Sequence, residues 1–239
     1  MDLYKVTLNI SQWLKDRVED AGAKGLVVGI SGGVDSAVVA ALCKKTFPDD
    51  SLAVIMPCHS NSEDREDAEL LAKHLQIPFK TVVLDEVFEV LLKNIGCKEK
   101  EEDLAVANIK PRLRMTTLYY FAQKYNYLVA GTGNKSELLT GYFTKYGDGG
   151  VDIEPIGHLF KTQVYELAEH LGIPKRIIER TPTAGLWKEQ SDEEEMGVTY
   201  KELDRYLSSG EAEPHVKNLV DILISRSRHK RQMPPVPSL

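Results

Sequence analysis

The first half of the chain alternates between two hydrophobic patterns. Short, almost continuously apolar runs predict buried β-strands at 25–30, 51–56, 79–84 and 127–131. The stretches that follow them predict helices over 37–45, 62–75, 85–95 and 104–125. Strands and helices that alternate in this order predict a Rossmann-like α/β fold, with a parallel sheet flanked by helices on both sides.

Helical periodicity also predicts elements outside this core. An amphipathic helix is expected over 3–22, and two further helices are expected over 199–207 and 214–225. Pro111 cannot sit comfortably inside a helix, because it lacks a backbone N–H. The regular part of the helix over 104–125 is therefore expected to begin at this proline.

Composition places the chain among ordinary globular proteins. With 239 residues, of which 42% are hydrophobic and 28% charged, the chain can build an ample core, and we expect residues 1–239 to form a single domain. The proline-rich tail at about 232–239 should be extended. The charged run within 96–103 should be a solvated turn, with a mobile lid as the alternative.

Net charge and cysteine spacing argue against several classes of protein. The formal net charge is −6, whereas proteins that bind nucleic acid broadly show a basic face. No apolar run reaches the length of a membrane span, and the first residues do not resemble a signal peptide, so we expect a cytoplasmic protein. The 3 cysteines are widely spaced without a C-x-x-C pair and indicate neither a zinc site nor a disulfide framework.

The first candidate site is the loop that joins the first strand of the sheet to its helix. Its residues are Gly29, Ile30, Ser31, Gly32, Gly33, Val34, Asp35 and Ser36. Backbone N–H groups in such a loop, together with the positive end of the helix dipole, bind phosphate oxygens. Asp35 could hold a magnesium ion on those phosphates, and we expect it to be an exposed carboxylate that contributes little to stability. The alternative is a plain turn between strand and helix.

A second loop, over 131–137, also lies between a strand and a helix. Loops at the carboxyl ends of parallel strands line the ligand crevice of an open sheet, so this loop should face the first one. Glu137 is then a candidate for a second magnesium ligand and Thr132 for a nucleotide contact. Alternatively, Glu137 only interacts favourably with the dipole of the following helix.

The segment 140–152 has an unusual composition, with several glycines, three aromatic residues and two aspartates. Long irregular loops in compact domains are usually functional or disordered. The aromatic rings could stack on a heterocyclic ring, and Lys145 and Asp152 could orient it by charge.

These motifs together resemble a known family. S-G-G-x-D-S at 31–36 is similar to the pyrophosphate loop of the N-type ATP pyrophosphatases. With K-x-R-x-R-M at 110–115 and T-G-Y-F-T-K-Y-G-D-G at 140–149, nearly the whole chain resembles the ammonia-dependent NAD synthetases. Pro111 departs from the small residue usual in that family. The resemblance implies the adenine nucleotide alpha hydrolase-like form of the Rossmann-like fold.

The resemblance also implies a reaction. The carboxylate of nicotinic acid adenine dinucleotide (deamido-NAD) would attack the α-phosphorus of ATP, and ammonia would then displace AMP from the acyl adenylate to give NAD. The implied cofactor is Mg²⁺, held by Asp35 and Glu137. Asp152 or Asp148 could stabilise ammonium and help to remove its proton, so Asp35, Glu137 and Asp152 form the implied catalytic set.

Substrate contacts follow from the family match. Besides the residues of the first loop, the implied ATP contacts are Thr132, Lys161 and Thr183. The implied deamido-NAD contacts are Arg112, Lys145, Asp152, His229 and Lys230. The family match also implies a homodimer with the dinucleotide at its interface, and a strip over 181–196 that closes over the site. By themselves, Arg112 and Lys161 could equally be surface residues.

Other classes remain as alternatives. A GMP synthetase-like or tRNA-modifying enzyme of the same superfamily shares the first loop, and a universal-stress-type ATP sensor shares the expected sheet. The large amidase domain of glutamine-using NAD synthetases has no counterpart in this sequence. Ammonia, either free or supplied by a separate protein, is therefore the expected nitrogen source.

Overall fold

The computed structural model describes residues 1–100, 103–183, 185–187 and 191–237. Parts of three predicted segments lie outside the described residues. They are 101–102 of the turn, 184 and 188–190 of the strip, and 238–239 of the tail.

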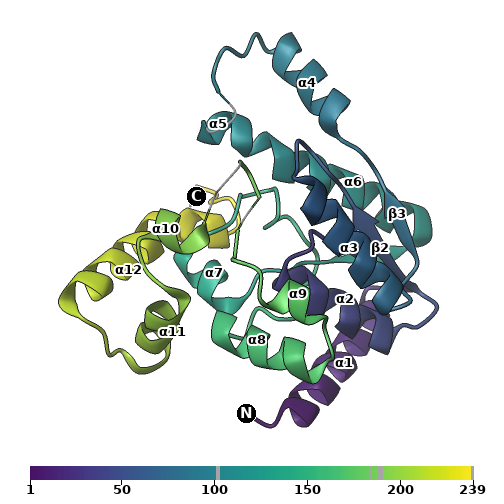
Figure 1. Ribbon diagram of the computed structural model, residues 1–239, viewed down its shortest axis with the longest axis horizontal. Coiled ribbons are helices and arrows are strands. Elements are labelled where there is room, and N and C mark those ends of the chain that lie inside the picture. Colours follow the sequence, from purple (N-terminus) through teal and green to yellow (C-terminus); the bar gives the residue numbers. More distant parts are fainter. Residues whose placement is uncertain (101–102, 184, 188–190, 238–239) are drawn as a thin grey trace.

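A parallel sheet of 4 strands forms the centre of the fold, in the order β3-β2-β1-β4. The strands are β1 (Gly25–Gly29), β2 (Ser51–Ile55), β3 (Phe79–Thr81) and β4 (Tyr127–Ala130). Leu26 of β1 pairs with Ser51 of β2 on one side and with Leu128 of β4 on the other. The predicted α/β fold with a parallel sheet is confirmed (Figure 1).

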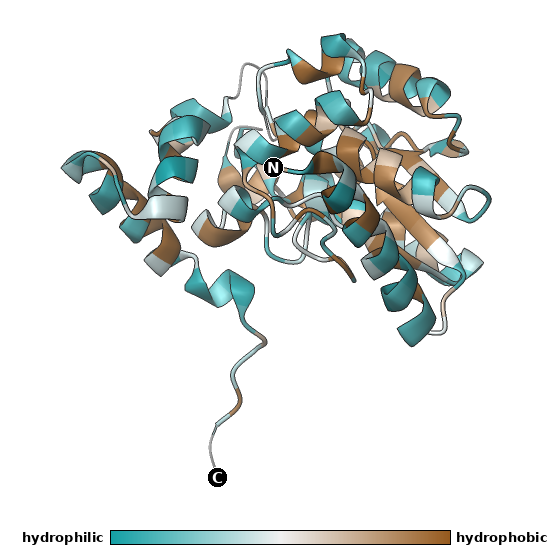
Figure 2. Cartoon of the chain, turned by 90° about the horizontal axis from the view of Figure 1, so that it is seen from below, coloured by the Kyte–Doolittle hydropathy of each residue, from teal (hydrophilic) through white to brown (hydrophobic). Residues whose placement is uncertain are grey.

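Each face of the sheet is covered by helices because side chains alternate along the strands. In β1, Leu26 and Val28 join one apolar cluster and Val27 joins the other. The first cluster includes side chains from α1 (Leu3–Asp20), α2 (Val34–Thr46), α3 (Ser62–His74), α8 (Lys161–His170) and α9 (Lys175–Ile178). The second includes side chains from α4 (Asp85–Asn94), α5 (Leu104–Ala107) and α6 (Ile109–Tyr125). In Figure 2 the hydrophobic colour follows the strands and the inner sides of these helices.

The C-terminal part of the chain builds a third, smaller apolar cluster beside the sheet. It contains buried side chains from α10 (Asp192–Met196), α11 (Tyr200–Ser209) and α12 (Pro214–Arg226). The helix α7 (Lys135–Thr140) lies between this cluster and the sheet (Figure 1). The short 3-10 helix η1 (Arg228–Arg231) follows α12 and contacts α7, since Arg231 donates to the carbonyls of Leu138 and Leu139. Beyond η1, the described part of the tail is exposed and extends away from the rest of the molecule (Figure 2).

Two predicted elements differ from the structure. The third strand ends at Thr81 instead of continuing to 84, because Leu84 already has φ −108° and ψ 2° at the start of α4. The helix predicted over 104–125 is broken at Asn108 into α5 and α6. Pro111 has no N–H to donate to the carbonyl of Ala107, so a continuous helix would lose a hydrogen bond there. The second helix begins at Ile109, two residues before the predicted start.

Among the described residues, none of the helices has the length and apolar character needed to cross a membrane. The thiols of Cys43, Cys58 and Cys97 are not joined in disulfides.

Candidate active site

A cleft of about 440 Å³ opens at the carboxyl ends of the strands. The loop 29–36 after β1, Thr132 after β4 and the described residues of 180–186 contribute to its walls. Ligands of open parallel sheets bind at this edge, and the volume lies within the usual range for small-molecule sites. The prediction that the two loops would face one another is confirmed, since the side-chain amide of Asn134 donates to Asp35 Oδ1 at 2.9 Å.

The hydroxyl groups of the first loop hold the loop itself in shape. The N–H of Ser31 donates to Ser36 Oγ at 3.2 Å, and the Ser36 hydroxyl donates to the carbonyl of Gly33 at 2.9 Å. Within the described chain, no side chain caps the N-terminus of α2 at Gly33. The positive end of that helix therefore faces the cleft, as phosphate binding requires.

Gly32 explains why this loop needs glycine. Its φ is +86°, and an added Cβ would lie 2.8 Å from the carbonyl oxygen of Asp64. The loop packs here against an ion-pair network in which Arg180 contacts Asp64 and, at 3.3 Å, Asp67. Because Arg180 also lines the cleft, this network joins the first loop to the segment that begins at Thr181.

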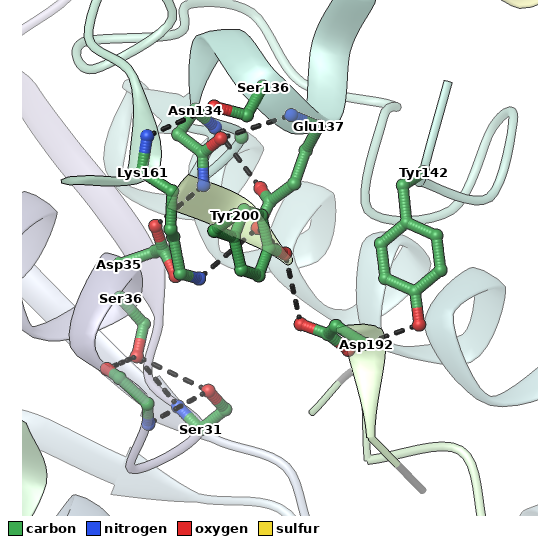
Figure 3. Close-up of polar contacts among 12 residues, drawn as sticks. Ser31, Asp35, Ser36, Asn134, Ser136, Glu137, Tyr142, Lys161, Asp192 and Tyr200 are labelled. Carbon is green, nitrogen blue, oxygen red and sulfur yellow. Dashed lines mark hydrogen bonds and ion pairs between the residues drawn. The ribbon is translucent and has the colours of Figure 1, made fainter. Parts of the chain in front are cut away.

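Lys161 lies between the two predicted magnesium ligands (Figure 3). Its ammonium is 2.5 Å from Asp35 Oδ2 and 3.4 Å from Glu137 Oε1, and the residue is only 2% exposed. Burial by itself would lower the pKa of Lys161, but the negative charges of Asp35 and Glu137 outweigh burial and raise it. Lys161 therefore stays charged and holds the two carboxylates together.

The two carboxylate oxygens of Glu137 have different partners. Oε2 accepts the backbone N–H of Asn134 at 3.2 Å, while Asn134 Oδ1 accepts the N–H of Glu137, which completes a capping box at the start of α7. Oε1 faces Lys161. Burial first, and then the charge of Asp35, raise the pKa of Glu137. The residue therefore caps its helix and also contributes a carboxylate to the cleft.

Asp35 is less exposed than the sequence suggested. Its side chain is 17% exposed and is bonded to both Lys161 and Asn134. The expectation of an exposed loop carboxylate that contributes little to stability is wrong, because removing Asp35 would leave a buried ammonium with one fewer counter-charge.

The donor set fits a magnesium ion that is shared with phosphates. Mg²⁺ is usually bound through one or two carboxylates together with substrate phosphates. Asp35 and Glu137 supply two such carboxylates, and the ammonium of Lys161 between them shows that their oxygens already accommodate a cation. Among the described residues there is no cluster of three or more His, Cys, Asp or Glu that could bind a metal without substrate.

Glu154 supports the second loop from behind. Its Oε2 accepts the N–H of Gly133 at 3.0 Å, and an added Cβ at Gly131 would overlap the carboxyl group. Burial raises the pKa of Glu154 to about 8, although the bond from Gly133 acts in the opposite direction. Glycine at 131 lets the loop approach this carboxyl closely.

The remaining predicted contacts fall into two groups. Thr183 and Lys230 line the cleft together with the first loop, Thr132 and Lys161. Arg112, Lys145 and His229 form a chain of contacts outside it, in which Arg112 donates to the carbonyl of Lys145 at 3.4 Å and Lys145 Nζ donates to that of His229 at 2.7 Å. Lys230 donates to the carbonyls of Gly141 at 2.8 Å and Phe143 at 2.7 Å.

Asp152 lies apart from both groups. It does not line the cleft, and its two carboxylate oxygens accept bonds from the phenol of Tyr119 at 2.9 Å and the N–H of Val129 at 2.8 Å. Asp148, the other candidate for the ammonium proton, does line the cleft.

Arg114 is the second arginine of the K-x-R-x-R-M motif and, like Arg112, is a candidate from the sequence for binding phosphate. It lines the cleft and donates to the carbonyl of Met56 at 3.1 Å. Sequence reasoning missed Asp192 in the cleft wall. Asp192 belongs to an acidic run that by itself would suggest solvent, yet it is 4% exposed. The signal available for Asp192 was its spacing of four residues from Met196, because residues at this spacing share a face of a helix and both are buried in α10.

Comparisons with known proteins agree on one family. A family model described as NAD synthase matches residues 6–234. An NH(3)-dependent NAD(+) synthetase from Carboxydothermus hydrogenoformans is 54% identical over 98% of this chain and 97% of that protein. The structure of NMN synthetase from Francisella tularensis matches with a TM-score of 0.95 at 38% identity, over 100% of both chains. The structure of an NH3-dependent NAD synthetase from Campylobacter jejuni, in complex with the nitrate ion, matches with a TM-score of 0.82 at 30% identity, also over 100% of both chains.

The raised pKa of Glu154 predicts how stability depends on pH. Because this pKa lies above its ordinary 4.5, the folded state retains the proton while the unfolded state loses it, and stability falls as the pH rises from about 4.5 through about 8. Glu154→Gln removes this dependence. Between pH 5 and pH 8, its free energy of unfolding should improve relative to wild type by about 2–4 kcal/mol, measured by urea unfolding.

A matched control is Glu169→Gln, which removes an exposed carboxyl from α8. Its difference from wild type should stay constant over the same pH range. A constant difference for Glu154→Gln as well would contradict the prediction.

Proposed function

The chain belongs to the NAD synthase family, a family of ATP-using ligases, and we propose that it amidates deamido-NAD to NAD with ammonia. In the first step, a carboxylate oxygen of the substrate bonds to the α-phosphorus of ATP, and the bond to the pyrophosphate group breaks. In the second step, ammonia bonds to the acyl carbon, AMP leaves, and a proton is lost from the nitrogen. We place this reaction in the cytoplasm and treat residues 1–239 as its single domain.

The residues of the cleft supply binding, orientation and charge neutralisation. The first loop and the N-terminus of α2 would hold the pyrophosphate portion of ATP. Lys161 would neutralise phosphate charge, with Thr132 and Thr183 as further ATP contacts. Asp35 and Glu137 would hold Mg²⁺, which when bound neutralises the phosphates and the leaving pyrophosphate. Asp148 in the cleft wall is the better placed acceptor for the ammonium proton.

The observation that supports this proposal best is the convergence of Asp35, Glu137 and Lys161 in one cleft with the glycine loop. Partly buried carboxylates bonded to a buried lysine beside a phosphate-binding loop have a clear use in a reaction on magnesium-bound ATP. A universal-stress-type sensor would not need them. GMP synthetase-like and tRNA-modifying enzymes are disfavoured by the family match.

We propose that the active protein is a homodimer. The helix α4 and its flanks expose a stripe of apolar side chains, each at least half exposed: Val83, Val87, Val90 and Ile95. Contiguous apolar surface of this kind is typical of a protein interface. Because α4 packs with α6, which carries Arg112, a second copy on this stripe would lie near the Arg112, Lys145 and His229 chain proposed to bind the dinucleotide.

A second candidate substrate is the smaller acid, nicotinic acid mononucleotide. The observation that favours it is the TM-score of 0.95 with the NMN synthetase from Francisella tularensis, over 100% of both chains. The adenylation and amidation steps would be the same, since only the carboxylate on the pyridine ring reacts.

The proposed reaction predicts that repeated turnover, with more than one pyrophosphate released per active site, requires ATP, Mg²⁺, deamido-NAD and ammonium together. Asp35→Asn should reduce the rate at least about 100-fold, because it removes a carboxylate proposed to bind the magnesium ion, whose positive charge neutralises the phosphates in the transition state. A coupled pyrophosphate assay measures the rate, and Asp20→Asn, at an exposed position at the end of α1, is the control. Release of orthophosphate, or full activity of Asp35→Asn, would contradict the proposal.

The choice between the two acids is tested by direct competition. Equal concentrations of deamido-NAD and nicotinic acid mononucleotide are mixed with limiting enzyme, and the two amides are separated by chromatography. The ratio of initial rates gives the ratio of kcat/KM, which we expect to favour the dinucleotide at least about tenfold. A ratio below one would replace the dinucleotide by the mononucleotide as the substrate.

The dimer predicts a concentration-dependent sedimentation coefficient. Val87→Glu places a charge in the apolar stripe and should convert the dimer to monomer at micromolar concentration, as measured by sedimentation velocity. Ile222→Glu, at a partly exposed apolar position on α12, is the control and should remain dimeric. A dimer that survives Val87→Glu and dissociates with Ile222→Glu would put the interface elsewhere.

A further inference from the structure

The helix α11 presents two buried polar side chains to the candidate active site. Tyr200 and Asp204 lie one helical turn apart on the same face of α11 and are 4% and 5% exposed. Neither was among the residues predicted from the sequence. Both contact the starts of α7 and α8, the two helices that carry Glu137 and Lys161.

Asp204 fixes α11 against those two helix starts. Its Oδ1 accepts the hydroxyl of Ser136, and its Oδ2 accepts the N–H of Thr162 at 2.9 Å. Ser136 Oγ in turn accepts the N–H of Lys161 at 3.0 Å. One carboxylate therefore ties the first turns of α7 and α8 to each other and to α11.

Tyr200 reaches further into the site (Figure 3). Its phenol oxygen lies 3.4 Å from Glu137 Oε1 and 3.1 Å from Asp192 Oδ2. The ammonium of Lys161 lies 4.9 Å from the centre of its ring, within the range of a cation–π contact. The side chain of Tyr200 thus contacts Glu137, Lys161 and Asp192.

The distances around Lys161 suggest what the phenol does. Asp35 forms a close ion pair with the ammonium at 2.5 Å, whereas Glu137 Oε1 stays at 3.4 Å. That same oxygen lies 3.4 Å from the Tyr200 hydroxyl, whose single proton is shared with Asp192 Oδ2 at 3.1 Å. The N–H of Asn134 holds only the other oxygen of Glu137. Without the phenol, Oε1 would move toward the ammonium, because the ion pair strengthens as water is excluded.

We propose that Tyr200 is a positioning residue of the ATP site, whose phenol holds Glu137 away from a full ion pair with Lys161. The inference rests on the proposed function, in which Glu137 binds magnesium. It means that Glu137 keeps an oxygen available to a divalent cation and that Lys161 remains available to phosphate.

The test is Tyr200→Phe, which keeps the ring and its packing and removes only the hydroxyl. Tyr206→Phe is the matched control, because Tyr206 lies on the same helix and donates its phenol to Asp221 Oδ1 at 2.7 Å. The binding of Mn²⁺ to the protein with saturating ATP, followed by electron paramagnetic resonance, is the primary measurement. Removal of a group that orients a metal ligand typically weakens metal binding 10–100-fold, so we expect at least about tenfold weaker Mn²⁺ binding in Tyr200→Phe.

Kinetic measurements separate positioning from general loss of structure. In Tyr200→Phe the Mg²⁺ concentration for half-maximal activity should rise about tenfold, while the KM for deamido-NAD changes less than about twofold. The thermal unfolding midpoints of both variants should be similar. Equal Mn²⁺ affinity in Tyr200→Phe, Tyr206→Phe and wild type would overturn the inference.

The metal titration also distinguishes this inference from the proposed function. If wild-type protein made no pyrophosphate from deamido-NAD but Tyr200→Phe still weakened Mn²⁺ binding, the reaction would be wrong and the positioning role would stand. If wild type were active and the variant bound Mn²⁺ normally, only the positioning role would be wrong.

Discussion

The site depends on one buried ammonium. Lys161 at the start of α8 draws together Asp35, which follows β1, and Glu137, which follows β4. These segments are neighbours only because β1 and β4 are adjacent parallel strands, which places their carboxyl ends at the same edge. A buried ion with incomplete pairing costs several kcal/mol, so this arrangement requires all three residues at once.

Helix starts converge on the same point. The helices α2 and α8 both begin at the cleft, so that their positive ends point toward the place where phosphates would lie. The backbone thus supplies partial positive charge while Asp35 and Glu137 supply negative charge. Such an opposed arrangement suits a magnesium-bound polyphosphate, which itself carries both signs, better than it suits a simple anion or a simple cation.

The sheet and the two loops could be predicted because each rests on local pattern. Apolar runs predicted the four strands, and the strand-to-helix context of the glycine loop predicted that it lies at the ligand-binding edge of the sheet. The sequence shows that position 32 is a glycine in a tight loop. It does not show which atoms exclude a larger residue there, because Asp64 and Arg180 come from distant parts of the chain. Asp35 was expected in solvent because its buried partner Lys161 lies far along the sequence.

The partners of Tyr200 and Asp192 could not be predicted from the sequence, for a related physical reason. Periodicity shows that one face of a helix is buried, but it does not show whether a polar residue on that face meets water or a partner. The break at Asn108 follows from Pro111, yet it also places Asn108 Oδ1 at 2.5 Å from the Thr144 hydroxyl, a contact across the cleft wall that no local rule predicts.

The small apolar cluster of α10, α11 and α12 is explained by the site and not by the sheet. The parallel sheet is already covered on both faces, so the fold does not need these helices for its main core. What they cover is the set of charged side chains beyond the carboxyl ends of β1 and β4. Asp204 bonds to the starts of α7 and α8, and the ring of Tyr200 packs against the ammonium of Lys161. Asp192, in the segment after Arg180, accepts a bond from the hydroxyl of Tyr200. Because charges interact more strongly where water is excluded, a separate apolar cluster over the site strengthens the contacts on which the chemistry depends.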